Sequence, residues 1–444
     1  MNPDEPAGAR AAANRVLAIL VVVYAVNFVD RNILSVLLQP IKEELGASDT
    51  AMGLLTGFAF AVFYTVAGIP IARLADRGSR RAIMAVGIAA WSLLTAASGL
   101  ARSFAGLALA RIGVGIGEAS ATPAAHSLIS DYFPPERRTR ALAIYNVGSS
   151  IGILLGLVLG GWLKEAVGWR ATFAVVGLPG LLVALGVWLG IPEPQRGLSE
   201  SRGDRGDSPG LRETLRFLRA QPSYLHVAFA AALYACPSYG LLHWAPTFLV
   251  RVHHLGFAEV GWKLGPIVGV SSAVGVLAAG ALCDRLAKRD VRWLCWIPAL
   301  STLVLVPCCA AFALAPDPNL ALLAYVPVNL VSAVFAPPSY AIGQGLAKLR
   351  MRALASAIML FVINLIGLGL GPTLVGMLSD ALAPRFGVES LRYALIASLA
   401  LAVWASVHSI FAARTLAADL ARSTATEATA PEGSAVSGIV QFDR

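Results

Sequence analysis

The stretch VLAILVVVYAVNFVDRNILSVLL, residues 16–38, decides the fold, because nearly all of its side chains are apolar. About 20 such residues in a helix span the hydrocarbon core of a bilayer. Asp30 and Arg31 nevertheless stand inside this stretch, and Arg111 and Glu118 stand inside a second apolar stretch. A charge in hydrocarbon costs roughly 2.5 to 3.5 kcal/mol, so such residues usually face a protein interior or a wet cavity. The sequence therefore predicts membrane helices that enclose charges with a functional role.

The composition places the chain in a membrane rather than in water. Of its 444 residues, 57% are hydrophobic and 14% are charged, against about 25% charged residues in soluble domains. The net charge of +9 does not indicate a nucleic-acid partner, because the basic residues are confined to short loops. The five cysteines lack the paired spacing of a zinc site or of a disulfide framework, so we expect no metal and no cofactor.

Hydropathy predicts twelve transmembrane helices, of which the first is residues 16–38. The others are expected near 51–72, 82–101, 104–129, 141–163, 171–191, 223–250, 257–282, 293–315, 319–346, 353–378 and 391–413. With both termini in the cytoplasm, 25 of the 35 Lys and Arg residues fall on the cytoplasmic side and 8 on the outside. The positive-inside rule therefore predicts cytoplasmic termini, in the inner (plasma) membrane of a cell.

A polar stretch in the middle of the chain divides it into two halves. We expect a cytoplasmic N-terminus at 1–15, an N-terminal six-helix bundle at 16–191, a cytoplasmic linker at 192–222, a C-terminal six-helix bundle at 223–413 and a disordered cytoplasmic tail at 414–444. The end of the linker alternates Arg with Leu or Phe. This pattern fits an amphipathic helix on the membrane surface and a solvated helical turn equally well.

The two halves carry similar segments at equivalent positions. ARLADRGSRR at 72–81 follows the second helix, and GALCDRLAKR at 280–289 follows the eighth. Both place an Asp-Arg pair, Asp76–Arg77 or Asp284–Arg285, four residues after a small residue. Parallel repeats of this kind occur in transporters built from two halves, with the substrate site between the halves.

These features resemble the major facilitator superfamily over nearly the whole chain. The similarity to its spinster-like branch, in the form of a bacterial-type homologue, lies in NFVDRNILS at 27–35, RIGVGIGEA at 111–119, FPPERRTRAL at 133–142 and WAPTFLVR at 244–251. The resemblance implies an all-α membrane protein with twelve transmembrane helices in two six-helix bundles.

Two positions depart from the superfamily pattern. Ala72 stands where the superfamily usually has Gly, and Leu157 stands where its antiporter signature has Pro. The glycines of helix five form a small-residue stripe that still allows another helix to approach closely: Gly148, Gly152, Gly156, Gly160 and Gly161. The stripe does not decide between antiport and symport.

The four intramembrane charges are expected to form two ion pairs between helices one and four. Arg111 and Glu118 are seven residues apart, so they share one helix face. We expect Arg31 to pair with Glu118 and Asp30 to pair with Arg111. Glu118 and Asp30 are the candidate proton-coupling residues, and Arg31, Glu118 and Arg111 are the candidate substrate-binding residues. In the alternative interpretation, all four charges only stabilise helix packing.

The repeated segments contain the candidate cytoplasmic gate. We expect the gate, which closes the inner side when the cavity faces outward, to consist of Asp76, Arg77, Arg81, Asp284 and Arg285. The neighbouring Arg80, Lys288 and Arg289 are interpreted as topology anchors only.

Other polar residues allow weaker predictions. Tyr239 and Asn364 fit either a cavity lining or helix-to-helix hydrogen bonds. His243, near the outer end of helix seven, is interpreted as an interface anchor. Prolines are expected to kink or unwind helix seven at Pro237, and helix ten at Pro337 and Pro338.

The resemblance also implies a substrate class. Spinster-like proteins include transporters of sphingosine phosphate and lysophospholipids, so we expect a proton-coupled transporter of a lysolipid-like or sphingolipid-like amphipath, acting as a monomer among membrane lipids by alternating access. A proton-coupled transporter of a small organic anion is the alternative, since Asp-Arg in helix one also resembles the anion:cation symporters. A non-transporting receptor or scaffold is a weaker alternative. No Walker loop or catalytic triad spacing is present, so we expect neither ATP-driven pumping nor an enzyme.

Overall fold

The structure is a computed structural model that describes residues 7–194, 210–332, 334–348 and 351–428. Within these residues all regular elements are helices. The N-terminal half contains α1 (Ala7–Leu45), α2 (Asp49–Leu54), η1 (Leu55–Ala59), α3 (Phe60–Arg77), α4 (Arg80–Ser98), α5 (Phe104–Glu118), α6 (Ala121–Tyr132), α7 (Pro135–Gly177) and α8 (Pro179–Gly190). The linker contains α9 (Leu211–Arg219). The C-terminal half contains α10 (Pro222–His253), α11 (Phe257–Ala287), α12 (Trp293–Leu314), α13 (Pro318–Ser332), α14 (Ala336–Leu346), α15 (Arg352–Val362), η3 (Ile363–Leu368), α16 (Gly369–Phe386), η4 (Gly387–Glu389), α17 (Ser390–Ser398) and α18 (Ala400–Ala428).

The number of membrane crossings follows from two sharp turns at glycine. Ten helical stretches of the described chain are long and apolar enough to cross a membrane, but two of them, Arg137–Gly190 with 54 residues and Leu354–Arg422 with 69, exceed one crossing. Each turns back at a glycine with positive φ, Gly168 at 78° and Gly387 at 55°, a conformation that strains other residues. Division at these turns yields the predicted twelve crossings.

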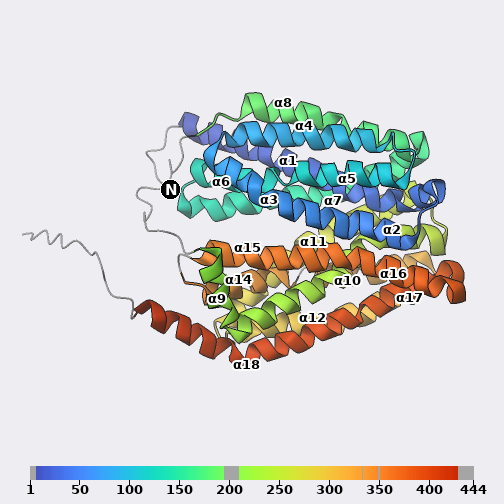
Figure 1. Ribbon diagram of the computed structural model, residues 1–444. Coiled ribbons are helices and arrows are strands. Elements are labelled where there is room, and N and C mark those ends of the chain that lie inside the picture. Colours follow the sequence, from blue (N-terminus) through green and yellow to red (C-terminus); the bar gives the residue numbers. More distant parts are fainter. Residues whose placement is uncertain (1–6, 195–209, 333, 349–350, 429–444) are drawn as a thin grey trace, which may run out of the picture.

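The helices form two bundles that lie side by side (Figure 1). One bundle comprises α1 to α8 and the other α10 to α18, and the contacts between them include α1 on α10, α2 and η1 on α16, α3 on η3, and α7 on α11. The start of α1 and the end of α18 lie at one end of the molecule. We call this end the termini face, and the opposite end, where α2 begins and α10 ends, the far face.

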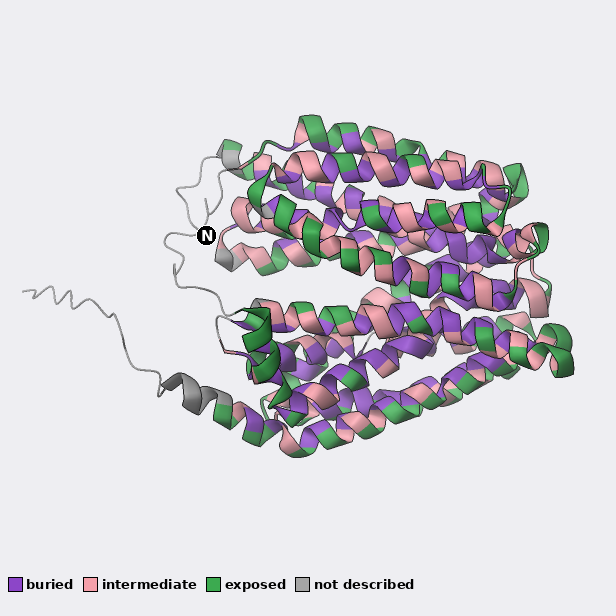
Figure 2. Ribbon diagram, viewed as in Figure 1, coloured by how far each residue is buried: buried purple, intermediate pink, exposed green. Residues whose placement is uncertain are grey.

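Burial follows the pattern expected of a protein surrounded by lipid. Figure 2 shows buried residues along the faces that helices turn toward one another, and exposed residues on the outside of the bundles. Many of the exposed residues are large and apolar, such as Leu182 (72% exposed), Leu277 (74%) and Leu303 (70%). An apolar exterior of this extent suits hydrocarbon better than water.

Glycines allow the two halves to touch backbone to backbone near the far face. A Cβ atom on Gly53 of α2 would lie 2.4 Å from the Pro372 carbonyl oxygen of α16. At the equivalent contact between α7 and α11, a Cβ atom on Gly261 would lie 2.4 Å from the Leu157 carbonyl oxygen. Such separations leave no room for any side chain, so these contacts depend on glycine.

The glycine stripe of helix five makes the close contacts that the sequence predicts. Within α7, Gly148, Gly152 and Gly156 meet the carbonyl oxygens of α1 residues, which would lie 2.3 to 2.9 Å from an added Cβ atom. Gly161 instead meets the Phe257 carbonyl of the other half, at 2.1 Å. The stripe therefore serves packing inside the first bundle and contact between the bundles.

The predicted disordered tail at 414–444 is partly wrong, because α18 continues to Ala428. Alanine-rich sequence favours helix, and Leu416 and Asp419 are buried. The Asp419 carboxylate accepts hydrogen bonds from the backbone N–H of Ser223, at 3.0 Å, and from its hydroxyl, which ties the segment to the start of α10. Residues 429–444 lie outside the described chain.

Two further expectations concerned prolines and the linker. Helix ten is interrupted as predicted, since α13 ends at Ser332 and α14 begins next to Pro337 and Pro338. Helix seven is not unwound at Pro237, because α10 runs on without interruption. The end of the linker forms α9, in which Leu218 is buried and the arginines are exposed, whereas residues 195–209 lie outside the described chain.

Exchange of Gly261 for Ala tests the contact between the halves. The added methyl group would clash with the Leu157 carbonyl, and overpacking of this kind typically costs about 1 to 3 kcal/mol. Gly186→Ala is the matched control, because nothing lies within 4 Å of its added Cβ atom and Ala favours helix by about 1 kcal/mol. We expect thermal unfolding in detergent to shift downward for Gly261→Ala only. Equal midpoints for both variants would contradict the glycine contact.

Candidate functional site

Two ion pairs join helices one and four inside the N-terminal bundle. Arg31 Nε of α1 donates to Glu118 Oε2 of α5 at 2.6 Å. Arg111 of α5 donates to Asp30 Oδ1 of α1 at 2.9 Å. This is the pairing predicted from helix geometry, because Arg111 and Glu118 lie two turns apart on the face of α5 that meets α1.

The Asp30–Arg111 pair is almost completely buried. Asp30 is 2% exposed and Arg111 is 3% exposed. The hydroxyl of Thr95, on α4, donates a second hydrogen bond to Asp30 at 2.5 Å. Sequence analysis missed Thr95, because a threonine in a membrane helix carries no distinguishing signal. The pair and its hydroxyl partner form a neutral unit that joins α1, α4 and α5.

The Arg31–Glu118 pair has a different environment. The Arg31 guanidinium carbon lies 5.4, 4.8 and 4.6 Å from the ring centroids of Phe28, Phe60 and Tyr64, distances at which a cation is attracted to an aromatic face. The Arg31 side chain is still 18% exposed. Glu118 Oε1 is buried and has no hydrogen-bond partner among the described residues. Arg31 is therefore accessible, and Glu118 has an oxygen atom without a hydrogen-bond partner.

A cavity between the halves explains the exposure of Arg31. It has a volume of about 70 Å³ and is lined by residues from both halves: Phe28, Arg31, Asn32, Leu34, Leu55, Thr56, Phe60, Arg111, Tyr239, Leu242, His243, Asn364 and Leu368. This volume is several times the roughly 10 to 15 Å³ that one water molecule needs, so the cavity has room for several water molecules or a small polar group. We call this space the central cavity.

Two π-helical turns border the central cavity, one in each half. Leu55 and Thr56 belong to η1, and Asn364 and Leu368 belong to η3. A π-helical turn inside an α-helix is rare and occurs often at functional sites. Both halves therefore depart from regular α-helix at the cavity.

The cavity wall resolves three of the weaker sequence predictions. Tyr239 and Asn364 line the cavity, which is one of the two roles that the sequence left open. His243 also lines it and is only 6% exposed, so its interpretation as an interface anchor is wrong. The α10 helix is tilted into the interface between the halves, and hydropathy alone carries no information on that placement.

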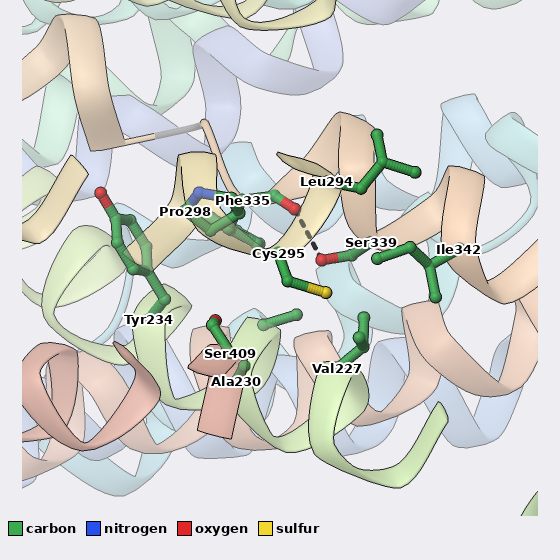
Figure 3. Close-up of a pocket in the computed structure, with 11 residues that line it drawn as sticks. Val227, Ala230, Tyr234, Leu294, Cys295, Pro298, Phe335, Ser339, Ile342 and Ser409 are labelled. Carbon is green, nitrogen blue, oxygen red and sulfur yellow. Dashed lines mark hydrogen bonds between the residues drawn. The ribbon is translucent and has the colours of Figure 1, made fainter. Parts of the chain in front are cut away.

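A second pocket lies inside the C-terminal bundle, between α10, α12, α14 and α18 (Figure 3). Its lining includes Cys295 and Ser339, whose hydroxyl donates to the Phe335 carbonyl at 2.6 Å. With a volume of about 10 Å³, it has room for at most about one water molecule. This pocket is a packing gap rather than a binding site.

The candidate gate residues lie at the termini face, and those whose side chains the structure describes are not joined to one another. Arg77, Asp284 and Arg285 are exposed, and the described side chains of the gate form no ion pair with each other. Arg81 stacks on Trp188, with its guanidinium carbon 5.0 Å from the ring centroid. Asp76 belongs to α3, but its side chain lies outside what the structure describes.

The interpretation of Arg80 as a topology anchor only is wrong. Its side chain is 3% exposed and forms ion pairs with Asp131 and with Glu193, the latter at 2.8 Å. Burial acts to raise the pKa of Glu193, but hydrogen bonds from the Arg81 backbone, Arg80 and Ser79 outweigh it and hold that pKa below its usual value. Because Arg80 opens α4 directly after the capping residue Ser79, it points into the bundle rather than into solvent.

A polar cluster closes the far face between the halves. The Asp49 carboxylate, at the start of α2, binds Arg251 of α10 at 2.6 and 2.8 Å. It also accepts from Lys42 at 2.7 Å and from the Ser379 hydroxyl at 2.6 Å. Arg251 further donates to Gln39 of α1 at 2.8 and 3.0 Å. We call these five residues the far-face clasp; it joins residues distant in sequence and was not predicted.

Two carboxylates reinforce this closure in a reciprocal way. Asp380 of the C-terminal half accepts from the backbone N–H groups of Asp49 and Thr50, at 3.0 and 2.7 Å, and so caps α2. Glu165 of the N-terminal half accepts from the backbone N–H of Ala258, at 3.0 Å, and so caps α11. Each half thus places a negative charge at the positive end of a helix of the other half.

Twelve crossings in two bundles, closed at one end and enclosing a charged cavity at mid-depth, define a secondary transporter that exposes its site to one side at a time. The chain belongs to the Major Facilitator Superfamily, whose profile matches residues 20–372. It is a multi-pass membrane transporter and not an enzyme.

Relatives narrow this assignment. The chain is 36% identical to an "MFS-type efflux pump" of Mycolicibacterium smegmatis, over 86% of this chain and 87% of that protein. It is 28% identical to a "Probable L-galactonate transporter" of Escherichia coli, over 65% of each chain. It superposes with a TM-score of 0.84 and 32% identity on a bacterial homologue of the human lysosomal transporter Spinster, in an inward-facing and unoccupied conformation, covering 92% of this chain and 98% of the other. The chain is a spinster-like member of the superfamily.

Neutralising one or both members of the Asp30–Arg111 pair measures its contribution to stability. Arg111→Met leaves the Asp30 carboxylate buried without its cation, and such a change typically costs about 3 to 5 kcal/mol. The double variant Asp30→Asn/Arg111→Met removes both charges. We expect the double variant to unfold at a higher temperature than Arg111→Met. If the stability lost in the double variant equalled the sum of the losses from the two single changes, the two charges would not depend on each other.

Proposed function

We propose that the protein is a proton-coupled secondary transporter of an anionic, amphipathic substrate that works by alternating access. The observation that carries this proposal is the position of Arg31, which is paired with Glu118 and at the same time lines the cavity between the halves. Protonation of Glu118 removes the charge that holds Arg31. The guanidinium is then available for the anionic group of a substrate.

This competition for Arg31 supplies the coupling. Proton binding at Glu118 and anion binding at Arg31 favour each other, and by linkage each raises the affinity for the other. Asp30 serves as the second proton-coupling residue, through its pair with Arg111. Arg31, Glu118 and Arg111 form the substrate-binding group, of which Arg31 and Arg111 line the cavity.

The membrane orientation assigns the two faces of the molecule. If the termini are cytoplasmic in the inner membrane, as the distribution of Lys and Arg favours, the far-face clasp closes the outside and the structure faces inward. The gate residues are then the groups that come together in the outward-facing state: Asp76, Arg77, Arg81, Asp284 and Arg285. The two bundles, joined by the linker, move as the two halves of a monomer.

The cavity wall supports a lysolipid-like or sphingolipid-like substrate. Apart from its polar groups, the wall consists of Phe28, Leu34, Leu55, Phe60, Leu242 and Leu368. No Lys or Arg of the C-terminal half is among the lining residues in the described part of the chain. The two cations of the first half, Arg31 and Arg111, and an apolar surface around them suit a charged head group with an acyl chain.

A small organic anion is the second candidate. The C-terminal half contributes Tyr239, His243 and Asn364 to the wall, and these groups suit a polar ligand. The relative named as a probable L-galactonate transporter is consistent with this alternative. Proton coupling through Arg31 and Glu118 is the same for both candidates.

Transport by the purified protein in liposomes decides between the two candidates. With an imposed pH gradient, we expect flux of a fluorescent lysophospholipid that excess gluconate does not inhibit, because the apolar wall binds the acyl chain. Liposomes without protein are the control. Gluconate flux without lysolipid flux would instead establish the small organic anion.

Exchange of Glu118 for Gln tests the coupling. Gln cannot take up or release the proton, so we expect flux that no longer responds to the pH gradient. Substrate affinity in the wild type is expected to rise as the pH falls, since protonated Glu118 frees Arg31, and to become independent of pH in the variant. Glu43→Gln, on the exposed end of α1, is the matched control. A full response in Glu118→Gln would leave the four charges with a packing role only.

A further inference from the structure

The wall of the central cavity opposite the charged helices contains a buried imidazole. His243 of α10 lines the cavity together with Arg31 and is 6% exposed. Its Nδ1 atom is buried and has no hydrogen-bond partner within the described part of the chain. The ring therefore retains hydrogen-bonding capacity that the protein itself does not use.

The neighbours of His243 do not explain this unused capacity. The adjacent Leu242 and Tyr239, one turn before His243, line the same cavity. The indole N–H of Trp244 already donates to the Pro372 carbonyl at 2.9 Å. A buried polar atom without a partner is unfavourable, and exceptions in a native protein call for an explanation. An occupant of the cavity is the partner that the geometry leaves open.

The chemistry of the ring indicates the kind of group that binds it. A neutral imidazole has one nitrogen that donates and one that accepts. A hydroxyl group both donates and accepts, so it matches either nitrogen, whereas a carboxylate or phosphate oxygen only accepts. The anionic oxygens have a better partner in Arg31, whose planar guanidinium suits carboxylate and phosphate geometry.

We propose that His243 is a specificity-determining residue that hydrogen-bonds a hydroxyl group of the substrate while Arg31 binds its anionic group. The ligand class is therefore a hydroxylated anion, in which a hydroxyl lies a few bonds from a carboxylate or phosphate. Lysophospholipids and sugar acids share this arrangement. This inference rests on the proposed function and assigns the part of the substrate that the C-terminal half selects.

Two ligand pairs test the selection, each with one member that lacks the hydroxyl. Gluconate is compared with hexanoate, and oleoyl lysophosphatidic acid with oleyl phosphate. Binding to the full-length protein in lipid nanodiscs is measured at one pH and without a gradient. We expect the wild type to prefer the hydroxylated member of at least one pair by about tenfold, the scale of one hydrogen bond, and the pair that shows the preference identifies the source of the ligand.

Three variants decide whether His243 is responsible. His243→Leu is expected to lower the preference to within about threefold, and His243→Asn, which retains a donor and an acceptor, to restore part of it. His226→Leu is the matched control on the same helix, since His226 contacts His408, ring nitrogen to ring nitrogen at 2.9 Å, and does not line the cavity. We expect it to keep the preference of the wild type.

The outcomes separate this inference from the proposed function. A preference that survives in His243→Leu, or an equal loss for both members of a pair, would overturn the role of His243. Absence of any preference in the wild type would overturn the ligand class. Flux that ignores the pH gradient while the preference still depends on His243 would overturn proton coupling alone.

Discussion

Charges inside hydrocarbon must be neutralised by one another, and the interior of the first bundle is arranged around this constraint. Its two carboxylates and two guanidiniums cancel in pairs between α1 and α5. Removing one partner of a buried pair is far more costly than removing both, so each pair behaves as a unit. The pairs nevertheless differ, since Asp30 has an additional hydroxyl partner, whereas Arg31 is partly open to the cavity. The same constraint thus yields one pair that is almost completely buried and one whose cation is partly open to the cavity.

Closure of the far face shows how a transporter can be stable in one state without being locked in it. The Asp49–Arg251 ion pair and the two reciprocal helix caps are polar contacts between the halves, and water can replace polar partners when the halves separate. The glycine contacts of α2 with α16 and of α7 with α11 add close packing, and one buried apolar cluster includes residues of both halves. An interface of this composition allows a two-state equilibrium whose populations a ligand can shift.

Several features were predictable because they depend on local sequence. The ion pairs followed from the seven-residue spacing of Arg111 and Glu118, and the twelve crossings from hydropathy with turns at Gly168 and Gly387. Features that require the two halves to be placed against each other were not predictable. Arg251 counted only as a loop cation, and His243 appeared to lie near a membrane surface. The helical extension of α18 was also missed. Its polar residues suggested disorder, but Asp419 has a buried partner, Ser223, on another helix.

The division of labour between the halves connects recognition with movement. The first half contributes the cation and its carboxylate, and the second half contributes neutral polar groups, so neither wall can bind a hydroxylated anion fully by itself. The binding free energy of a substrate is therefore most favourable when both walls contact it. This favours conformations in which the halves close around the cavity. Because the far face is already closed, that approach must occur toward the termini face, where the exposed Arg77, Asp284 and Arg285 lie. In the proposed mechanism, substrate binding between unlike walls is thus the physical means by which recognition at mid-depth drives closure of the open end.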